Sequence, residues 1–359
     1  MATSEFARLP GFRDFPPEEF ALRRHVQESW RRVARRYGFL EYDGPPLESL
    51  DLYVEKSGEE IVGQLYTFTD KGGRAVAMRP EMTPSLARIL GERSRGMSKP
   101  IRWFSMPQLF RYERQQRGRL REHFQWNVDV VGEEGVAADA EILAVAIDGL
   151  RELGLTAEDF AARVSDRRLL TGLLRAVGVA DERLPAAFAV IDKIERLPEE
   201  KSTELFRTEV GLDQARIDRL RGLLKGADFA VLERDFGDSE EVGEEIERLR
   251  AYFSMLDAMS LADFVRLDLR IVRGLAYTAS WSWWAASPCR PSVSEWGTSC
   301  LGSCSPTGVW CRRSRALSTT FWFRSRPISG PWPCASRTPF GIGDIPSRTH
   351  CAIRAWASR

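Results

Sequence analysis

The chain has 359 residues, of which 29% are charged and 43% hydrophobic, and its formal net charge is +1. That length accommodates two domains with a sizeable core. Residues 1–278 hold 42 Lys+Arg and 49 Asp+Glu, and this acidic balance gives no evidence for broad nucleic-acid binding. No apolar segment approaches the about 18 residues of a membrane span, and no signal-peptide pattern follows Met1. The first 278 residues contain no cysteine. We therefore expect a cytoplasmic protein without membrane contact.

Helical and strand patterns follow one another over residues 1–163. A helical pattern follows Pro16 and Pro17 and runs to Tyr37, with apolar side chains recurring on one side. Thr83 is suited to cap a second helix, with Pro84 in its first turn. Further patterns predict a helix over 136–153 and strands over 39–42, 64–69, 75–79, 101–113 and 123–132. These elements predict an α+β fold in which helices flank an antiparallel sheet.

Residues 164–265 differ from the part before them. They are charged and leucine-rich, and their helical pattern is interrupted at Gly178, Pro185, Pro198 and Gly211. We interpret this segment as a mostly helical insertion, after which residues 266–278 return to the core.

The most informative stretch spans residues 110–129 and reads FRYERQQRGRLREHFQWNVD. Its pattern predicts a strand, an arginine-rich turn and a second strand. Gln125, Asn127 and Asp129 would share one face of the second strand, because side chains alternate along a strand. Arginine suits phosphate because its planar guanidinium donates two hydrogen bonds at once. The stretch therefore predicts a pocket wall for an anionic, polar ligand. An exposed hairpin with a solvated charged turn is the alternative.

This order of residues resembles motif 2 of the class II aminoacyl-tRNA synthetases, in the form found in histidyl-tRNA synthetases. Other signatures of that family are similar to LPGFRDFPPEE at 9–19, MRPEMTPSLAR at 78–88 and VRGLAY at 272–277. The resemblance extends over about residues 5–278. It implies that residues 1–163 and 266–278 form the catalytic core and that the insertion contacts the tRNA acceptor arm. The first helix and the strand after it resemble motif 1, which implies a homodimer.

The resemblance also implies a two-step reaction. The carboxylate of L-histidine attacks the α-phosphate of ATP to give histidyl-adenylate and pyrophosphate, and the histidyl group is then transferred to tRNA(His). Mg²⁺ would accompany ATP, because hard cations bridge phosphate oxygens. No protein residue is assigned as a metal ligand. Catalysis would depend on positioning and on neutralising developing charge.

Positions that match the family's motifs imply a role for each site residue. For ATP, the resemblance implies that Arg111 and Arg273 contact the α-phosphate and that Arg119 or Arg121 contacts the terminal phosphates. Glu113 would contact the adenine edge, and Phe124 or its neighbour His123 would stack on the adenine ring. For histidine, the implied contacts are Glu81, Thr83 and Gln125 at the α-amino group, Asp129 at the imidazole, and Tyr277 as a further contact. Purely structural alternatives are an Arg111–Glu113 ion pair, a Thr83 helix cap and a Glu81–Arg79 ion pair.

Residues 279–359 have a different composition. They hold ten arginines, no lysine and only two acids, together with all six cysteines and eight of the eleven tryptophans. The histidine-specific box should continue YYTG but reads Tyr277-Thr278-Ala279, and a turn similar to motif 3 survives only at 340–344. We hypothesise that this irregular tail is mostly a frameshift product, without an anticodon-binding domain, and that it leaves the site inactive as written. A cysteine metal site and a disulfide domain are weaker alternatives.

Two other functions are compatible with this core. The synthetase-like regulatory subunit of ATP phosphoribosyltransferase has the same core without an anticodon-binding domain, and a pseudo-enzyme would bind ATP or histidine without turnover. The intact FRYERQQRGRLR segment and the helical insertion favour a histidine–tRNA ligase over the regulatory subunit.

Overall fold

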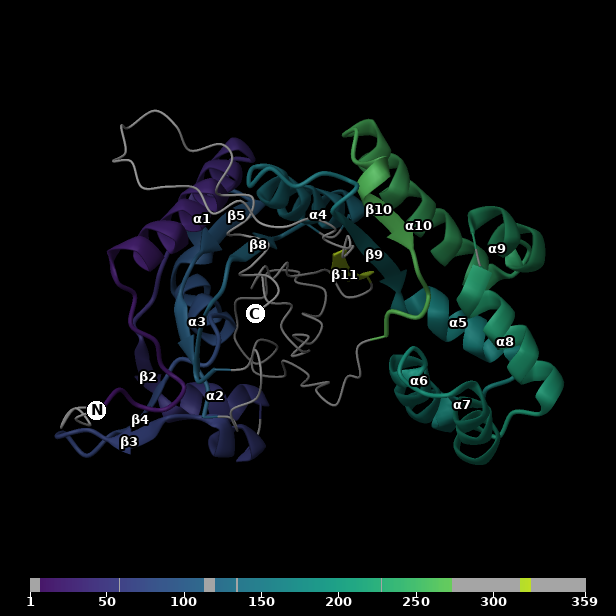
Figure 1. Cartoon of the computed structure of the whole chain (residues 1–359), viewed down its shortest axis with the longest axis horizontal. Coiled ribbons are helices and arrows are strands. Elements are labelled where there is room, and N and C mark those ends of the chain that lie inside the picture. Colours follow the sequence, from purple (N-terminus) through teal and green to yellow (C-terminus); the bar gives the residue numbers. More distant parts are fainter. Residues whose placement is uncertain are drawn as a thin grey trace, which may run out of the picture.

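The computed structural model describes residues 7–57, 59–112, 120–133, 135–226, 228–272 and 317–323. Over these ranges the chain forms an amino-terminal region of strands and helices, followed by a helical region (Figure 1). The expected α+β class is therefore confirmed. Among the described helices, none combines the length and the apolar composition that a membrane crossing needs.

The central sheet has the strand order β1-β5-β8. Its members are β1 (Leu40–Glu41), β5 (Ile101–Ser105) and β8 (Asn127–Val131). β5 runs antiparallel to β8 and parallel to β1. Helices α1 (Pro17–Arg36) and α4 (Val136–Arg151) pack against one face, where Trp30 of α1 stacks on Trp126 with 5.4 Å between ring centroids. The helix predicted over residues 17–37 and its apolar side are thus confirmed.

Two smaller sheets complete the amino-terminal region. One has the order β2-β4-β3, formed by β2 (Leu47–Ser49), β4 (Ala75–Met78) and β3 (Thr67–Thr69). The other pairs β6 (Gln108–Phe110) with β7 (Glu122–Phe124). The helices between these strands are α2 (Leu50–Ser57), η1 (Glu59–Gln64), α3 (Thr83–Arg93) and η2 (Ser94–Gly96).

The strand predicted over 101–113 is divided in two. β5 ends at Ser105 and β6 begins at Gln108, with Pro107 between them. Proline has no N–H to donate to a strand ladder, so it ends regular pairing here. The strands predicted over 64–69 and 75–79 form a hairpin, since Thr69 pairs with Ala75, but the first of them begins only at Thr67.

Strands of a third small sheet lie directly before and after the helical region in the chain. β9 (Phe160–Asp166) pairs in parallel with β10 (Val265–Leu267). Between them lie α5 (Arg167–Val177), η3 (Asp181–Arg183), α6 (Leu184–Lys193), α7 (Glu199–Leu205), the π-helical turn η4 (Phe206–Val210), α8 (Gln214–Gly226), α9 (Phe229–Phe236), α10 (Glu240–Ala258) and η5 (Ala262–Phe264). The predicted breaks coincide with element ends: Gly178 and Gly211 follow α5 and η4 with φ of 96° and 86°.

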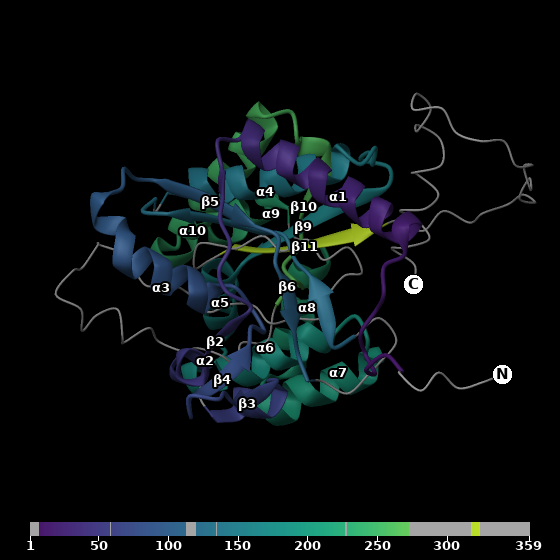
Figure 2. The ribbon, with the colours of Figure 1, turned by 90° about the vertical axis from the view of Figure 1, so that its left-hand side faces the viewer.

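One segment of the tail has described structure. β11 (Leu317–Phe323) pairs antiparallel with β9 along its whole length, from Leu317 opposite Asp166 to Phe323 opposite Phe160. Figure 2 shows this strand in yellow, and in the sheet order β10-β9-β11 it lies beside β9. We expected an irregular tail, and these seven residues are an exception to that expectation. The remaining residues of 279–359 lie outside the described ranges.

Candidate active site

A polar wall follows the return strand of the hairpin. Gln125 and Asn127 are 7% and 1% exposed, and the Gln125 side-chain amide donates to the Asn127 side-chain oxygen at 2.6 Å. Asp129, the next residue in the alternation, is 3% exposed. Trp126 and Val128 point to the opposite face and pack in the apolar layer with α1 and α4. The predicted alternation is confirmed, and it arises because one face of the sheet is buried by helices while the other gathers polar groups.

The alternation separates the two candidate aromatic rings. Phe124 lies on the face away from Gln125: its ring meets Phe15 edge-to-face at 5.7 Å, and the guanidinium of Arg23 lies 4.5 Å from its centroid. β7 ends at Phe124 and β8 begins at Asn127, and the side chain of His123 interacts with that of Gln125, which lies in this break. Burial lowers the pKa of His123 to about 4, and the positive charge of Arg111 adds to this effect. His123 is therefore a neutral ring at neutral pH on the polar wall.

Arg111 lies where the hairpin meets the turn that precedes α3. Its backbone N–H donates to the Arg121 carbonyl at 2.9 Å, which continues the β6–β7 pairing by one step. Its Nε donates to the Pro80 carbonyl at 3.2 Å. Arg111 is thus held beside the segment that carries Glu81 and Thr83.

Glu81 and Thr83 are buried together, with exposed fractions of 5% and 6%. Helix α3 begins at Thr83 itself, Met82 occupies the N-cap position, and no side chain caps the helix. The predicted Thr83 cap is therefore wrong: Met82 already has helical dihedral angles, and the Thr83 hydroxyl donates to the Glu81 carboxylate at 3.2 Å instead. This leaves a carboxylate–hydroxyl pair in the site.

Arg79 anchors the turn that precedes α3 to neighbouring segments. Arg79 is 6% exposed, and its guanidinium donates to the Asp43 carboxylate and the Gly44 carbonyl at 2.7 Å each and to the Gln108 carbonyl at 3.0 Å. The Phe110 N–H donates to the Arg79 carbonyl at 3.0 Å. These contacts join the turn to β6, so the segment of Glu81 and the hairpin of Arg111 form one unit.

The amino-terminal signature is anchored on the same hairpin. The Arg121 N–H donates to the Gly11 carbonyl at 3.0 Å, and its guanidinium lies 4.2 Å from the centroid of the Tyr112 ring. Gly11 has φ of +88°, and a Cβ there would lie 2.7 Å from the Arg121 side chain, so this approach requires glycine. The buried Glu122 carboxylate accepts from the Arg13 backbone N–H at 2.9 Å and from the Gln108 amide at 2.6 Å. The motifs in the sequence do not reveal this Arg13–Glu122 anchor, and only the strand alternation indicates that Glu122 points away from the face of His123.

Four predicted site residues lie outside the described ranges: Glu113, Arg119, Arg273 and Tyr277. The Arg111–Glu113 ion pair is therefore a prediction that the structure does not address. Among the described residues, no group of three His, Cys, Asp or Glu side chains is arranged to hold a metal ion. The remaining predicted residues lie on the two joined segments described above.

This arrangement of strands, hairpin and helices is the fold of a class II synthetase core. The histidyl-tRNA synthetase from Nostoc sp. PCC 7120 superposes with a TM-score of 0.67 at 22% sequence identity, covering 77% of this chain and 63% of that one. A Bacillus halodurans structure titled as an ATP phosphoribosyltransferase regulatory subunit/histidyl-tRNA synthetase gives a TM-score of 0.65 at 21% identity, covering 77% and 71%. At these identities the two structures establish the fold alone.

Sequence comparison establishes the family. A profile described as Histidyl-tRNA synthetase matches residues 11–286, and the chain belongs to this family. It is 42% identical over 279 residues to the histidine–tRNA ligase of Opitutus terrae, covering 77% of this chain and 63% of that protein. It is 40% identical over 268 residues to the chloroplastic/mitochondrial histidine–tRNA ligase of Arabidopsis thaliana, covering 74% and 54%. The chain thus spans just over half to under two thirds of the length of these relatives.

Proposed function

We propose that this chain carries the histidine-activating core of a histidine–tRNA ligase. One observation carries the proposal. The side chain of Arg111, on the hairpin, donates to the Pro80 carbonyl and so lies beside the buried Glu81–Thr83 pair. An arginine beside buried acceptors suits a reaction in which a carboxylate attacks a phosphate while an ammonium group is held nearby. The curated relatives that are 40% and 42% identical carry the same activity in their names.

In this proposal ATP binds along the hairpin. Arg111 contacts the α-phosphate, with Arg273 on the same group, Glu113 at the adenine edge, and Arg119 or Arg121 at the terminal phosphates. Mg²⁺ arrives with ATP on its phosphate oxygens. We assign the ring that faces adenine to His123 rather than Phe124, because Phe124 is engaged on the far face by Phe15 and Arg23.

Histidine binds on the polar wall and the turn. Glu81, Thr83 and Gln125 accept from its α-amino group, Asp129 accepts from the imidazole N–H, and Tyr277 contacts the same ligand. The support for this assignment is that Glu81, Thr83, Gln125 and Asp129 are buried polar side chains on the two segments that meet at the contact of Arg111 with Pro80.

The remaining proposals concern partners and organisation. Residues 1–163 and 266–278 form the catalytic core, and residues 164–265 form the insertion that contacts the acceptor arm of tRNA(His). Two copies associate through the motif 1 segment, where Phe20 and Leu40 are 42% and 66% exposed. The protein acts in the cytoplasm.

The tail is proposed to be mostly a frameshift product. Its support is the change of composition after residue 278 and the end of the family match at residue 286. Sequencing the source gene across this point tests it, and an uninterrupted reading frame into residues 279–359 would refute it.

The function is tested by histidine-dependent ATP–pyrophosphate exchange, measured on this chain and on a version with the reading frame restored. We expect exchange in the restored version, with this chain inactive because its tail disrupts the site. Exchange in neither version would contradict the ligase and favour the regulatory subunit, which does not aminoacylate tRNA. Glu200→Gln, a change at an exposed position of α7, serves as a control for handling and folding.

A further inference from the structure

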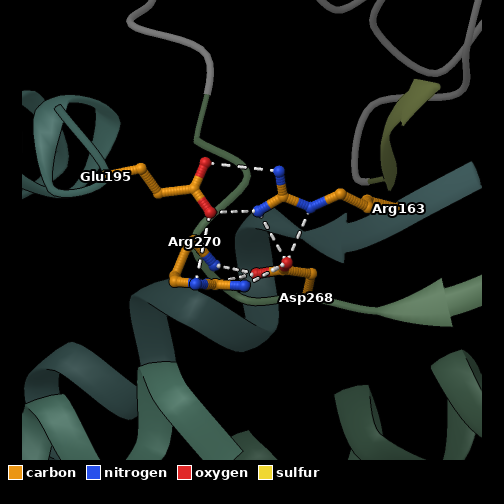
Figure 3. Close-up of polar contacts among 4 residues, drawn as sticks. All are labelled: Arg163, Glu195, Asp268 and Arg270. Carbon is orange, nitrogen blue, oxygen red and sulfur yellow. Dashed lines mark hydrogen bonds and ion pairs between the residues drawn. The ribbon is translucent and has the colours of Figure 1, made fainter. Parts of the chain in front are cut away.

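Four charged side chains form a closed ring where β9, β10 and the helical region meet (Figure 3). Arg163 lies in β9, Glu195 follows α6, and Asp268 and Arg270 follow β10. Arg163 contacts Asp268 at 2.7 Å and Glu195 at 2.6 Å. Arg270 contacts Asp268 at 2.8 Å and Glu195 at 3.2 Å. Each arginine therefore contacts both acids, and charges of opposite sign alternate around the ring.

The ring is only partly open to solvent. The side chains of Asp268 and Arg163 are 9% and 16% exposed, whereas those of Arg270 and Glu195 are 34% and 45% exposed. Hydrogen bonds with Asp268 raise the pKa of Arg270. Desolvation opposes ionisation of Asp268, but hydrogen bonds from Arg270 and the charge of Arg163 outweigh it and hold the pKa of Asp268 below its ordinary value. The pKa shifts of Asp268, Arg163 and Arg270 all favour their charged forms, and neutralising one member of the ring leaves buried charges less compensated.

The same ring organises the chain as it leaves β10. The Asp268 N–H donates to the Val164 carbonyl at 2.8 Å, and the Asp268 carboxylate accepts from the Arg270 N–H at 3.0 Å, which closes a tight turn. Leu269 and Val272 are 2% and 6% exposed and belong to the apolar cluster of the helical region. Residues 268–272 are therefore held by β9, by their own turn and by the helical region, and Glu195 supplies the polar contact from the helical region.

We propose that Glu195 is a positioning residue that couples the helical region to residues 268–272. The turn held by the ring immediately precedes Arg273, the next residue in the chain. A displacement of α6 moves Glu195, and Glu195 in turn displaces Arg163 and Arg270 through its ion pairs with them. This part of the inference rests on the proposed function, because that proposal gives Arg273 its role at the α-phosphate.

Hydrogen–deuterium exchange of the full chain tests the coupling without requiring activity. Glu195→Gln keeps the shape of the side chain and removes its charge, and Glu200→Gln is the matched control in the same region. We expect amides of residues 268–272 to exchange about three- to tenfold faster in Glu195→Gln, a loss of about 0.7–1.4 kcal/mol of local protection. Exchange in β5 and β8 should not change. Equal exchange at 268–272 in both variants would overturn the coupling.

Kinetics of the frame-restored chain tests the positioning role. Small misplacement of a catalytic group costs up to about 100-fold in rate. Glu195→Gln should therefore lower kcat of pyrophosphate exchange by about 10- to 100-fold, with the KM for histidine nearly unchanged, and Glu195→Asp should recover part of the rate. An unchanged kcat would overturn the positioning role. Absence of exchange in the frame-restored parent would instead overturn the proposed function, and the amide-exchange result would still decide the coupling.

Discussion

His123 makes the stability of this protein depend on pH. The ring lies on the polar wall, and burial lowers its pKa to about 4 from an ordinary value of 6.5, with the charges of Arg111 and Arg13 acting in the same direction. Between these two pH values the unfolded chain binds a proton at His123 and the folded chain does not. The free energy of unfolding must therefore fall as the pH falls through this window.

The size of the effect follows from the difference between the two pKa values. A lowering from 6.5 to about 4 corresponds to a ceiling of about 3 kcal/mol of stability, which is fully present above pH 6.5 and lost by about pH 4. His123 keeps some contact with solvent, so the measured loss should lie below this ceiling. His123→Gln, which cannot be protonated, should lose less stability than the parent chain over the same window.

The assay is urea unfolding at pH 7.5, 6.0, 5.0 and 4.5, followed by tryptophan fluorescence. The buried Trp30–Trp126 stack contributes to this signal from the central sheet, and the eight tryptophans of residues 279–359 are common to all the proteins compared. His25→Gln is the matched control, because His25 is exposed on α1. Carboxylates protonate in all three proteins, so the difference between His123→Gln and the other two isolates the histidine. Parallel loss of stability in all three would refute the reasoning.

Three further changes test the site and the core. Gly149→Ala should destabilise by about 1–3 kcal/mol in urea unfolding, because its Cβ would lie 2.5 Å from the Trp126 ring. Gly91→Ala in α3, whose Cβ meets nothing within 4 Å, should stabilise by up to about 1 kcal/mol instead. Arg111→Ala should lower histidine-dependent pyrophosphate exchange of the frame-restored chain by about 100- to 1,000-fold with an unchanged melting temperature. An equal loss in Arg24→Ala, at an exposed position of α1, would contradict a specific role.

The elements with strong periodic patterns could be predicted from the sequence, and so could which face of each element packs in the apolar core. Alternation from Gln125 to Asp129 correctly separated the polar wall from Trp126 and Val128. Extended two residues toward the amino terminus, the same alternation places His123 on the polar wall and Phe124 on the opposite face. Assignment from the family's motif left the choice between the two rings open, because the motif orders residues along the chain and does not specify faces.

Other features depend on contacts that local patterns do not contain. Thr83 followed by Pro84 is a good start for a helix, but whether the hydroxyl caps the helix depends on the dihedral angles of Met82 and on the nearby Glu81 carboxylate. The charged ring joins Arg163 to Asp268 across 105 positions of the chain. Each of its members, taken alone, has the pattern of an ordinary surface charge, so only the pairing of β9 with β10 reveals the ring.

Composition also does not indicate that the helical region shares its core with the rest of the protein. One side of α4 contributes Val145 to the cluster of the central sheet, and another contributes Leu143, Ile147 and Leu150 to the cluster that continues through β9 and the helical region. A helix that is apolar on several sides is stable only when it is covered on all of them.

We therefore expect that deleting residues 167–264 and bridging the gap with a glycine–serine linker will not leave a folded core. The deletion would expose Leu143, Ile147 and Leu150 on α4 and remove the packing partners of β9. The product should bind a hydrophobic dye and elute as aggregates in size-exclusion chromatography. A monodisperse product with the parent's near-ultraviolet circular dichroism would show that the two regions fold independently. That result would also weaken the coupling through Glu195, because a region that packs separately would not transmit its displacement to residues 268–272 through a shared core.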